Sequence, residues 1–492
     1  MTGAPRDGSK NPAPRPRWML SIQAGFWRFL MSIGMLLHKL APPRPPKPNF
    51  SRHIPATISG KAGTIPLQFY LPMDYESQKR LWSNRARDDL DGLSEEEDGL
   101  PMGKGKNRRV STSLSTLSQR VRRRSQSGKR WGNYPVVINF HGGGFTLGTA
   151  TDDARWCGTV VNECHAVVIS VDYRKAPEYP FPTAVEDGVD ALLWVHGHAD
   201  ELGIDKDKIA LSGFSSGGNM AITVALRLWD EQNGFTRDDL SRPNSRQKAE
   251  RALHGSATLL GSESSSSTKV PSDDPNIEIL RPEDSPPVSP LNGPSHARLN
   301  PTQIKEAATT VTHKHLPDVS IRCIVPWYPS LDYTRTREQR RATNVRKDQE
   351  LPAVFTNLFD DSYLHPPDTI SLDSPYLSPG VAPTSLLKNA LPYEIIMHTC
   401  EFDMLLDEGK DFRARLESPE IGKHVTYIMV EGVPHGWDKA PNPLKPTPGV
   451  REHYLRACRE MRRVFGTQVG VQERPTGFGP SAAPRGSIAV VR

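Results

Sequence analysis

A glycine-bounded serine turn restricts the fold of this chain more than any other feature of its sequence. Residues 213–218 read Gly-Phe-Ser-Ser-Gly-Gly, directly after the strand-like run 208–212 and at the start of a helical pattern. A G-x-S-x-G sequence in that position is typical of a nucleophile elbow, a turn so tight that neighbouring positions must lack side-chain bulk. The sequence therefore predicts a strand–turn–helix unit that holds the Ser215 hydroxyl clear of a sheet.

Short apolar, β-branched runs recur along the chain, and helical patterns lie between them. The expected strands are residues 136–140, 166–171, 209–212, 321–326, 393–397 and 425–430, with helices at 184–199 and 218–229. Strands that alternate with helices imply a parallel sheet covered on both faces. Residues 51–72 carry short alternating stretches, which indicate edge strands. The expected fold class is therefore α/β, with a mostly parallel central sheet flanked by helices.

The composition indicates that segments without a buried core interrupt the folded domain. The 492 residues are only 36% hydrophobic and include 45 prolines, which points to solvated segments that bury little. We expect disorder in the tails 1–17 and 467–492 and in two insertions, a basic loop at 79–130 and a second segment at 232–316. The α/β domain is then assembled from residues 51–78, 131–231 and 317–466.

The net charge of +6 comes from the basic loop. Residues 79–130 contain 14 Lys/Arg and 7 Asp/Glu, a balance of +7, so the other residues sum to 6 − 7 = −1. A nearly neutral body argues against nucleic-acid binding. Ser111 and Ser125 stand in R-R-x-S sequences that fit basophilic kinases, and phosphorylation would remove about 1.5–2 positive charges per site. A solvated basic linker is the alternative interpretation.

The cysteine pattern indicates the redox state of the cellular compartment in which the protein folds. The five cysteines are odd in number and contain no C-x-x-C pair, which argues against a disulfide scaffold and a thiolate zinc site. Only one glycosylation sequon occurs, at residues 49–51. A reducing compartment fits best, and we expect a protein that is cytoplasmic or associated with the endoplasmic reticulum membrane or another lipid surface. No metal or organic cofactor is expected.

Residues 18–40 form a strongly apolar segment with three interpretations. A cleaved signal peptide is disfavoured, because no small-residue cleavage pattern precedes the following prolines. A spanning helix has the right length, but Arg28 near its middle costs about 2.5–3.5 kcal/mol. An interfacial helix suits a polar stripe at helical spacing, formed by Ser21, Gly25, Arg28, Ser32 and Lys39. Membrane association is preferred, and a helix packed over the catalytic domain as a cap is the alternative.

A second glycine motif follows the expected strand 136–140, at His141-Gly142-Gly143-Gly144. Cleavage of an ester places negative charge on the carbonyl oxygen, and preorganised backbone N–H groups stabilise that charge. The amides of Gly143 and Gly144, together with that of Ser216, could converge on one oxygen. The charged, proline-rich residues 172–187 are expected to be architectural and to brace this loop.

The last two expected strands are each followed by a candidate for proton transfer. A serine nucleophile needs a base, and the base needs an orienting carboxylate. His435 follows the final strand, and Glu401, Asp403 and Asp407 follow the strand before it. Active sites of open α/β sheets lie at the carboxyl ends of strands. The residues alone favour His435 as base and leave three carboxylates open.

Together these motifs resemble the hormone-sensitive-lipase-like group of α/β-hydrolases, which also contains arylacetamide deacetylase and many microbial esterases. The resemblance covers 130–230 and 318–465. It is carried by HGGGF at 141–145, residues 172–187, GFSSGG at 213–218, SPYLSP at 374–379, EFDMLLDEG at 401–409 and PHGW at 434–437. The chain departs from the group at Phe214, where Asp is common, at Ser216, where Ala is common, and at Trp437, where Phe is common.

The resemblance implies an α/β-hydrolase fold with a helical cap over the acyl pocket. It implies Ser215 as nucleophile, Asp403 as acid and His435 as base, with residues 141–144 as the oxyanion loop. The expected function is a serine esterase, lipase or deacetylase that cleaves a hydrophobic ester through an acyl-enzyme. The alternatives are a non-catalytic small-molecule receptor, a membrane-surface scaffold, or an amidase with the same machinery.

Overall fold

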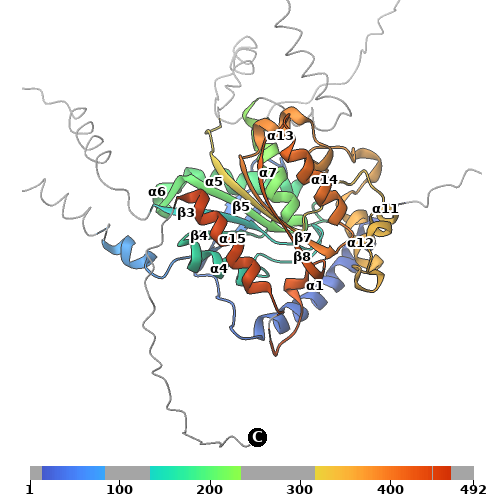
Figure 1. Cartoon of the computed structure of the whole chain (residues 1–492), viewed down its shortest axis with the longest axis horizontal. Coiled ribbons are helices and arrows are strands. Elements are labelled where there is room, and N and C mark those ends of the chain that lie inside the picture. Colours follow the sequence, from blue (N-terminus) through green and yellow to red (C-terminus); the bar gives the residue numbers. More distant parts are fainter. Residues whose placement is uncertain (1–13, 82, 84–132, 234–315, 446, 467–492) are drawn as a thin grey trace, which may run out of the picture. The chain divides into compact units, whose positions relative to one another are not determined.

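An eight-stranded sheet runs through the described part of the chain (Figure 1), in the order β1-β2-β4-β3-β5-β6-β7-β8. At one edge β1 (Phe50–Pro55) pairs antiparallel with β2 (Thr64–Tyr70), which pairs antiparallel with β4. The remaining neighbours are parallel; these strands are β3 (Tyr134–Phe140), β4 (Val167–Val171), β5 (Ile204–Phe214), β6 (Ile321–Trp327), β7 (Glu394–Phe402) and β8 (His424–Pro434). The predicted mostly parallel sheet is confirmed, but β2 is an internal strand and not an edge.

The computed structural model describes residues 14–81, 83, 133–233, 316–445 and 447–466. The N-terminal part and the part that follows residue 316 contribute to one compact unit. Most of the expected basic loop, the second insertion and both tails lie outside the described residues. Ser111 and Ser125 also lie outside them, so their phosphorylation stays a prediction.

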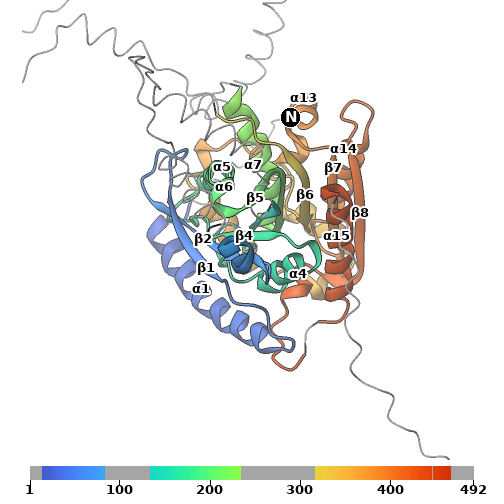
Figure 2. The ribbon, with the colours of Figure 1, turned by 90° about the vertical axis from the view of Figure 1, so that its left-hand side faces the viewer.

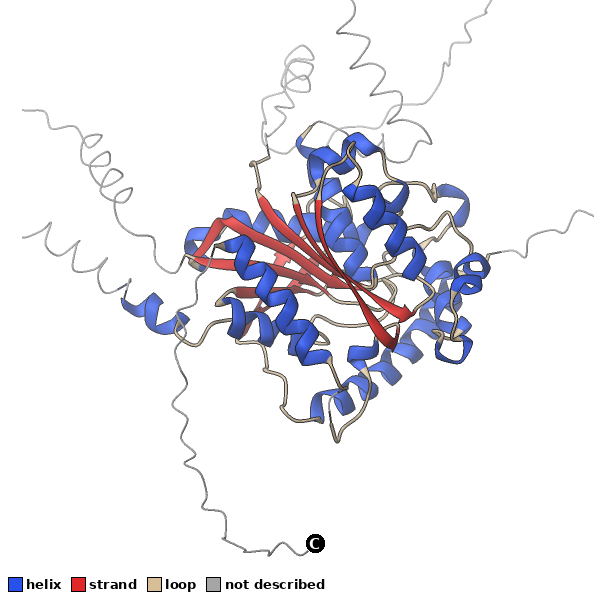
Figure 3. Ribbon diagram, viewed as in Figure 1, coloured by secondary structure: helices blue, strands red, loops and turns tan. Residues whose placement is uncertain are grey.

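Helices cover both faces of the sheet (Figure 3). One face carries α4 (Ala154–Cys164) and α15 (Val450–Phe465), which pack on each other. The other carries α5 (Thr183–Gly197), α7 (Ser216–Gln232), α13 (Thr384–Ala390) and α14 (Leu406–Glu417). Every residue of β3 and β4 is buried, which explains why these strands read as continuous apolar runs. Short helices complete the chain: α6 (Ala199–Leu202), η1 (Lys347–Gln349), η2 (Pro367–Thr369), η3 (Pro379–Val381) and η4 (Trp437–Lys439).

Three further helices form a cap: α1 (Arg17–Leu40), α11 (Arg337–Thr343) and α12 (Ala353–Tyr363). Figure 2 shows α1 running along the outside of the body. α1 packs on α12, where the rings of Trp27 and Phe355 lie 4.5 Å apart edge to face. By length and composition α1 could cross a bilayer, and 17% of its most apolar window is buried.

Some boundaries differ from those expected. α1 begins at Arg17, one residue inside the expected N-terminal tail. Residues 75–81 are helical, so ordered structure continues past the expected start of the basic loop at residue 79. The helix α4 was not anticipated, because its apolar residues are interleaved with glycine, threonine and asparagine. All five cysteines are buried free thiols.

Candidate active site

The turn between β5 and α7 is closed by two glycines. A Cβ atom at Gly213 would lie 2.1 Å from the carbonyl oxygen of Gly217, and one at Gly217 would lie 2.0 Å from the Phe140 carbonyl oxygen. Ser215 itself has φ 54° and ψ −114°, a sparsely populated conformation that persists only where the surroundings impose it. The sequence therefore folds here into the tight turn expected, with Ser215 at its apex.

Two hydrogen bonds join the three side chains that the sequence singled out. Ser215 Oγ lies 2.8 Å from His435 Nε2, and His435 Nδ1 lies 2.7 Å from Asp403 Oδ2. The second carboxylate oxygen of Asp403 accepts the N–H of Leu405 at 3.0 Å. A carboxylate held from both sides fixes the imidazole with Nε2 directed at the serine.

Sheet geometry explains why Asp403, and not its neighbours, meets His435. β7 and β8 are adjacent and parallel, so the residues that follow them emerge at the same edge of the sheet. Glu401 instead accepts the N–H of Gly432 at 2.6 Å, and Asp407 lies 3.7 Å from Lys410 on the surface. Of the three carboxylates left open by the residues, Asp403 is the one that is hydrogen-bonded to His435.

The surroundings of His435 favour its protonated form. Burial alone would lower the pKa of His435, but the negative charge and hydrogen bond of Asp403 outweigh burial and raise it above the ordinary value. Asp438, which is also buried, adds to this effect. This arrangement can accept a proton at His435 Nε2 and stabilise the imidazolium that results.

The glycine loop after β3 lies against the elbow. Gly143 has φ +121° and Gly144 has φ +59°, so both adopt left-handed conformations that favour glycine. Among the hydrogen bonds within the described residues, the amides of Gly143, Gly144 and Ser216 donate none. Ser216 is also the first residue of α7, whose N-terminal amides are free to bind negative charge.

His141, unlike the two glycines, is packed into the interior below the loop. Its ring is fully buried and stacks on Tyr173, with centroids 4.2 Å apart, and its Nε2 lies 3.5 Å from Asp172. Tyr173 Oη donates to the His141 carbonyl at 2.9 Å. Of the residues grouped with the oxyanion loop, His141 therefore supports the loop and does not line the pocket.

Residues 172–187 form the brace that the sequence indicated. Burial would raise the pKa of Asp172, but the hydrogen bond and charge of His141 lower it below the ordinary range. Arg174 and Asp187 form a buried ion pair at 2.6 Å, and Arg174 also donates to Ser59 Oγ. These contacts join the segment to the glycine loop and to the β1–β2 connection.

A small pocket of about 30 Å³ lies beside Ser215. Its floor contains Ser215, Ser216, His435 and Gly144, and the cap supplies its roof. The remaining lining residues are Ser330, Tyr333, Arg337, Leu351, Phe359, Met404 and Leu405. The described residues contain no cluster of three or more His, Cys, Asp or Glu placed to hold a metal ion.

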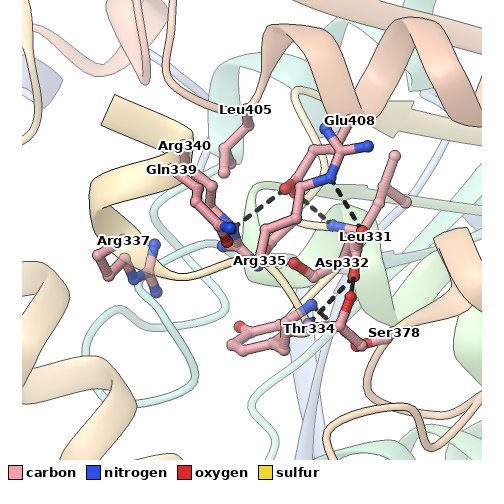
Figure 4. A network of polar contacts seen from close by, with 12 residues as sticks. Leu331, Asp332, Thr334, Arg335, Arg337, Gln339, Arg340, Ser378, Leu405 and Glu408 are labelled. Carbon is pink, nitrogen blue, oxygen red and sulfur yellow. Dashed lines mark hydrogen bonds and ion pairs between the residues drawn. The ribbon is translucent and has the colours of Figure 1, made fainter. Parts of the chain in front are cut away.

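One wall of the pocket is held by a polar network that the sequence did not reveal (Figure 4). Glu408 accepts the N–H of Leu331 at 2.7 Å and lies 3.2 Å from Arg340 Nε. Asp332 accepts the amide and hydroxyl of Thr334. Burial raises the pKa of Glu408 to about 7. The network ties α11 to the start of α14, directly beside Leu405 in the pocket.

A second buried network lies behind the histidine. Lys439 contacts Asp438 at 2.6 Å and Asp153 at 3.1 Å, and its Nζ lies 3.6 Å from the centre of the Phe214 ring. Asp438 accepts the Tyr328 hydroxyl at 2.5 Å, and the Tyr328 ring meets His435 edge to face. The Trp-Asp-Lys sequence directly after His435-Gly436 was the signal that could have pointed to it.

Known proteins resemble parts of this chain in sequence. Over residues 137–275 and 303–439 the chain matches a family described as alpha/beta hydrolase fold. It is 47% identical over 104 residues to an arylesterase of Saccharolobus solfataricus, covering 21% of this chain and 34% of the arylesterase. It is 25% identical over 386 residues to the hormone-sensitive lipase of Ictidomys tridecemlineatus, covering 61% of this chain and 50% of the lipase.

A solved structure extends the likeness in fold. A thermostable esterase from Pseudomonas putida superposes with a TM-score of 0.52 at 20% identity, covering 94% of this chain and 100% of the esterase. The matched regions span 34% of the arylesterase and 50% of the lipase. The likeness to the P. putida esterase shows the α/β-hydrolase arrangement of strands and helices.

Proposed function

This chain belongs to the alpha/beta hydrolase fold family, in its hormone-sensitive-lipase-like group, and we propose that it is a serine hydrolase of carboxylic esters. The observation that carries the proposal is the continuous hydrogen-bonded line from Ser215 through His435 to Asp403, beneath a pocket lined by Gly144 and Ser216. The relatives named esterase and lipase support the same reaction class.

In the proposed reaction Ser215 Oγ attacks the carbonyl carbon while His435 Nε2 takes the hydroxyl proton. The new oxygen–carbon bond converts the carbonyl oxygen to an oxyanion, which the amides of Gly143, Gly144 and Ser216 stabilise. The imidazolium then protonates the departing alkoxide, leaving an acyl group on Ser215. Water deprotonated by His435 attacks that acyl group, and collapse of the second intermediate releases the acid and regenerates the serine.

A hydrophobic ester is the substrate class that we propose. Leu351, Phe359, Met404 and Leu405 supply an apolar surface around the nucleophile, and burial of an apolar acyl or alcohol group against them contributes roughly 25 cal/mol per Å². The same machinery could cleave amides, but an amine is a worse leaving group than an alcohol. Ester cleavage is therefore the reaction proposed.

We also propose that α1 attaches the protein to a lipid surface without crossing it. Arg28 donates to the carbonyls of Thr146 and Ala176 and to the carboxylate of Glu178, at 2.8–2.9 Å. Lys39 donates to Thr151 at 2.9 Å. Because these polar side chains hold the helix against the body, its apolar side is directed outward, as in an interfacial helix.

The test is hydrolysis of p-nitrophenyl esters from acetate to palmitate by wild type and Ser215→Ala. We expect the variant to lose activity by at least about 10³-fold, and the chain-length profile of the wild type to report the usable pocket. A well-folded wild type that hydrolyses none of these esters would instead favour a non-catalytic receptor. A protein whose biological role survives Ser215→Ala would favour a membrane-surface scaffold.

A further inference from the structure

Part of the wall of the catalytic pocket is polar, although the proposed substrate is a hydrophobic ester. Ser330, Tyr333 and Arg337 line the pocket together with the catalytic groups. All three belong to one stretch of chain, which leads from the end of β6 to the first residue of α11. A purely apolar substrate would strip water from these side chains and return no hydrogen bonds, which costs free energy. The pocket therefore contains polar groups that the proposed reaction leaves unused.

The Ser330 hydroxyl is buried without a well-formed hydrogen bond. Ser330 is 6% exposed, and no described group partners its Oγ at good hydrogen-bond geometry. Burial raises the pKa of Tyr333, while the charge of Arg337 and a weak contact with the Ser330 hydroxyl oppose that rise, so the three side chains are neighbours. Because a buried hydroxyl without a partner destabilises a fold, its place in the pocket points to a partner that arrives with the substrate.

The Arg337 guanidinium is held at one edge and has donors left at the other. Its Nε and Nη2 donate to the two carboxylate oxygens of Asp360 in α12, at 2.7 and 2.6 Å. Among the described residues, none accepts a hydrogen bond from Nη1. Burial lowers the pKa of His435 and Asp403 raises it, and Arg337 adds a smaller lowering effect, which places its charge near the proposed base. An arginine fixed through one edge presents the other in a defined orientation.

The stretch that carries these polar groups is fixed to the catalytic body. The Ser330 carbonyl accepts a hydrogen bond from Asn219 Nδ2 of α7 at 2.8 Å. The amide of Tyr333 donates to Ser378 Oγ, also at 2.8 Å. Because α7 begins directly after Ser215, these bonds hold the polar groups in place relative to the proposed nucleophile. Groups that are ordered before binding lose less entropy when a ligand arrives.

The unused groups can all donate hydrogen bonds to oxygen. The two hydroxyls and the Nη1 of Arg337 are donors, and a carboxylate is a pure acceptor with room for several of them. A hydrogen bond between a guanidinium and a carboxylate is also stronger than one between neutral groups. Asp360 balances the formal charge of Arg337, but it occupies the other edge and is 25% exposed, so water screens it. A carboxylate therefore complements this wall better than a neutral carbonyl or hydroxyl.

We propose that the substrate is an ester that also carries a carboxylate, which Arg337, Ser330 and Tyr333 bind beside the reacting carbonyl. The apolar lining at Leu351 and Leu405 contacts the hydrocarbon part of the same molecule. The inference rests on the proposed function and narrows its substrate class to esters with an acidic group. That group belongs either to the acyl part, as in a half-ester of a dicarboxylic acid, or to the alcohol part, as in an ester of a hydroxy acid. The same three side chains recognise it in both cases.

Two pairs of substrates test the proposal with the full chain and separate these two sources. Monomethyl succinate against methyl butyrate places the carboxylate on the acyl part. The acetate ester of 4-hydroxyphenylacetate against 4-ethylphenyl acetate places it on the alcohol part. The measured quantity is the ratio of kcat/KM within each pair. We expect wild type to favour the carboxylate in at least one pair, and Arg337→Gln to reduce that ratio by about tenfold or more.

Two further variants separate binding from folding. Arg346 forms the same two-bonded pair with Asp348, at 2.7–2.8 Å, but lies outside the lining of the pocket, so Arg346→Gln is the matched control and should keep the wild-type ratio. Ser330→Ala removes a hydroxyl that has no well-formed hydrogen bond to lose. It should lower the ratio without lowering Tm, and it decides the question even where Arg337→Gln does not fold.

A wild type that favours the carboxylate in neither pair would overturn the proposal. So would a preference that survives both Arg337→Gln and Ser330→Ala. A preference that Arg346→Gln lowers equally would reflect the charge of the whole surface and would overturn the assignment to the pocket. Failure of the proposed function looks different: no member of either pair would be hydrolysed, and Ser215 would not react with a fluorophosphonate.

Discussion

Two acidic residues raise the pKa of His435. Asp403 is hydrogen-bonded to its ring, and Asp438 acts through its negative charge. Together they raise the pKa of His435 above its ordinary value, about 6.5. The proposed base must be neutral to accept the Ser215 proton. Activity should therefore be present at pH values above this raised pKa and should be lost as the pH falls through it.

Asp403→Asn tests this assignment. Removing the charge removes the main influence that raises the pKa of His435, so the acid limb of kcat/KM should move to lower pH. The rate itself should fall by about 10⁴-fold, because an amide can stabilise the wrong tautomer of the imidazole. The measurement is kcat/KM between pH 5 and 9, with Asp407→Asn, a surface carboxylate in the first turn of α14, as control. An acid limb that does not move would contradict the role of Asp403.

At the residue scale, local motifs were sufficient to predict that the structure brings Ser215, His435 and the glycine loop together. They could not separate Asp403 from Glu401 and Asp407, because all three lie within seven residues and only the placement of β7 beside β8 distinguishes them. Glu408 reads as a surface charge of an amphipathic helix. In the structure it is buried and pairs with Arg340, which comes from a distant part of the chain.

The elbow between β5 and α7 depends on close packing of backbone. Gly217→Ala would place a Cβ atom 2.0 Å from the Phe140 carbonyl oxygen. We expect a destabilisation of about 3 kcal/mol or more, together with loss of activity, because the strand or the helix must shift. Gly197→Ala, at a helical position where a Cβ meets nothing within 4 Å, should be neutral or slightly stabilising. Thermal denaturation of the two variants checks this, and equal melting temperatures would refute it.

α1 illustrates what an element-level pattern can and cannot predict. The apolar segment 18–40 identified the helix almost to the residue. The pattern could not tell whether the polar stripe faces water or protein. The structure turns Arg28 toward Thr146 and Glu178, so the charged part of the stripe holds the helix to the body. Such a contact depends on loops more than 100 residues away, which periodicity does not encode.

On the scale of the whole molecule, stability should respond to the ionisation of Glu408. Its pKa is raised from 4.5 to about 7 by burial, so the folded state binds the proton more tightly than the unfolded chain. The resulting stabilisation is fully present below about pH 4.5 and is lost as the pH rises through 7.

Glu408→Gln should remove the pH-dependent stabilisation that the Glu408 carboxyl group contributes. We expect the free energy of unfolding of the wild type, relative to the variant, to decrease between pH 5 and 8. Urea denaturation at several pH values measures the difference, and Glu417→Gln, on the exposed side of the same helix, controls for charge removal. A difference that stays constant with pH would show that Glu408 does not titrate in this range.

The mostly parallel sheet follows from alternating strands and helices, and the motifs at the strand ends predict where the candidate site lies. The cap is harder to predict, because α1 (Arg17–Leu40) packs on α12 (Ala353–Tyr363), which is far from it in the sequence. Their packing depends on rings such as Trp27 and Phe355, which have no shared motif. The sequence therefore predicts the α/β body more fully than it predicts the cap that covers the pocket.

The most direct test of the central claim is covalent labelling of the folded wild type by a fluorophosphonate. We expect one adduct per chain, mapped by peptide mass spectrometry to Ser215. The adduct should be absent in Ser215→Ala and should form far more slowly in His435→Ala. Labelling of another residue, or no labelling of well-folded protein with or without anionic vesicles, would contradict the account.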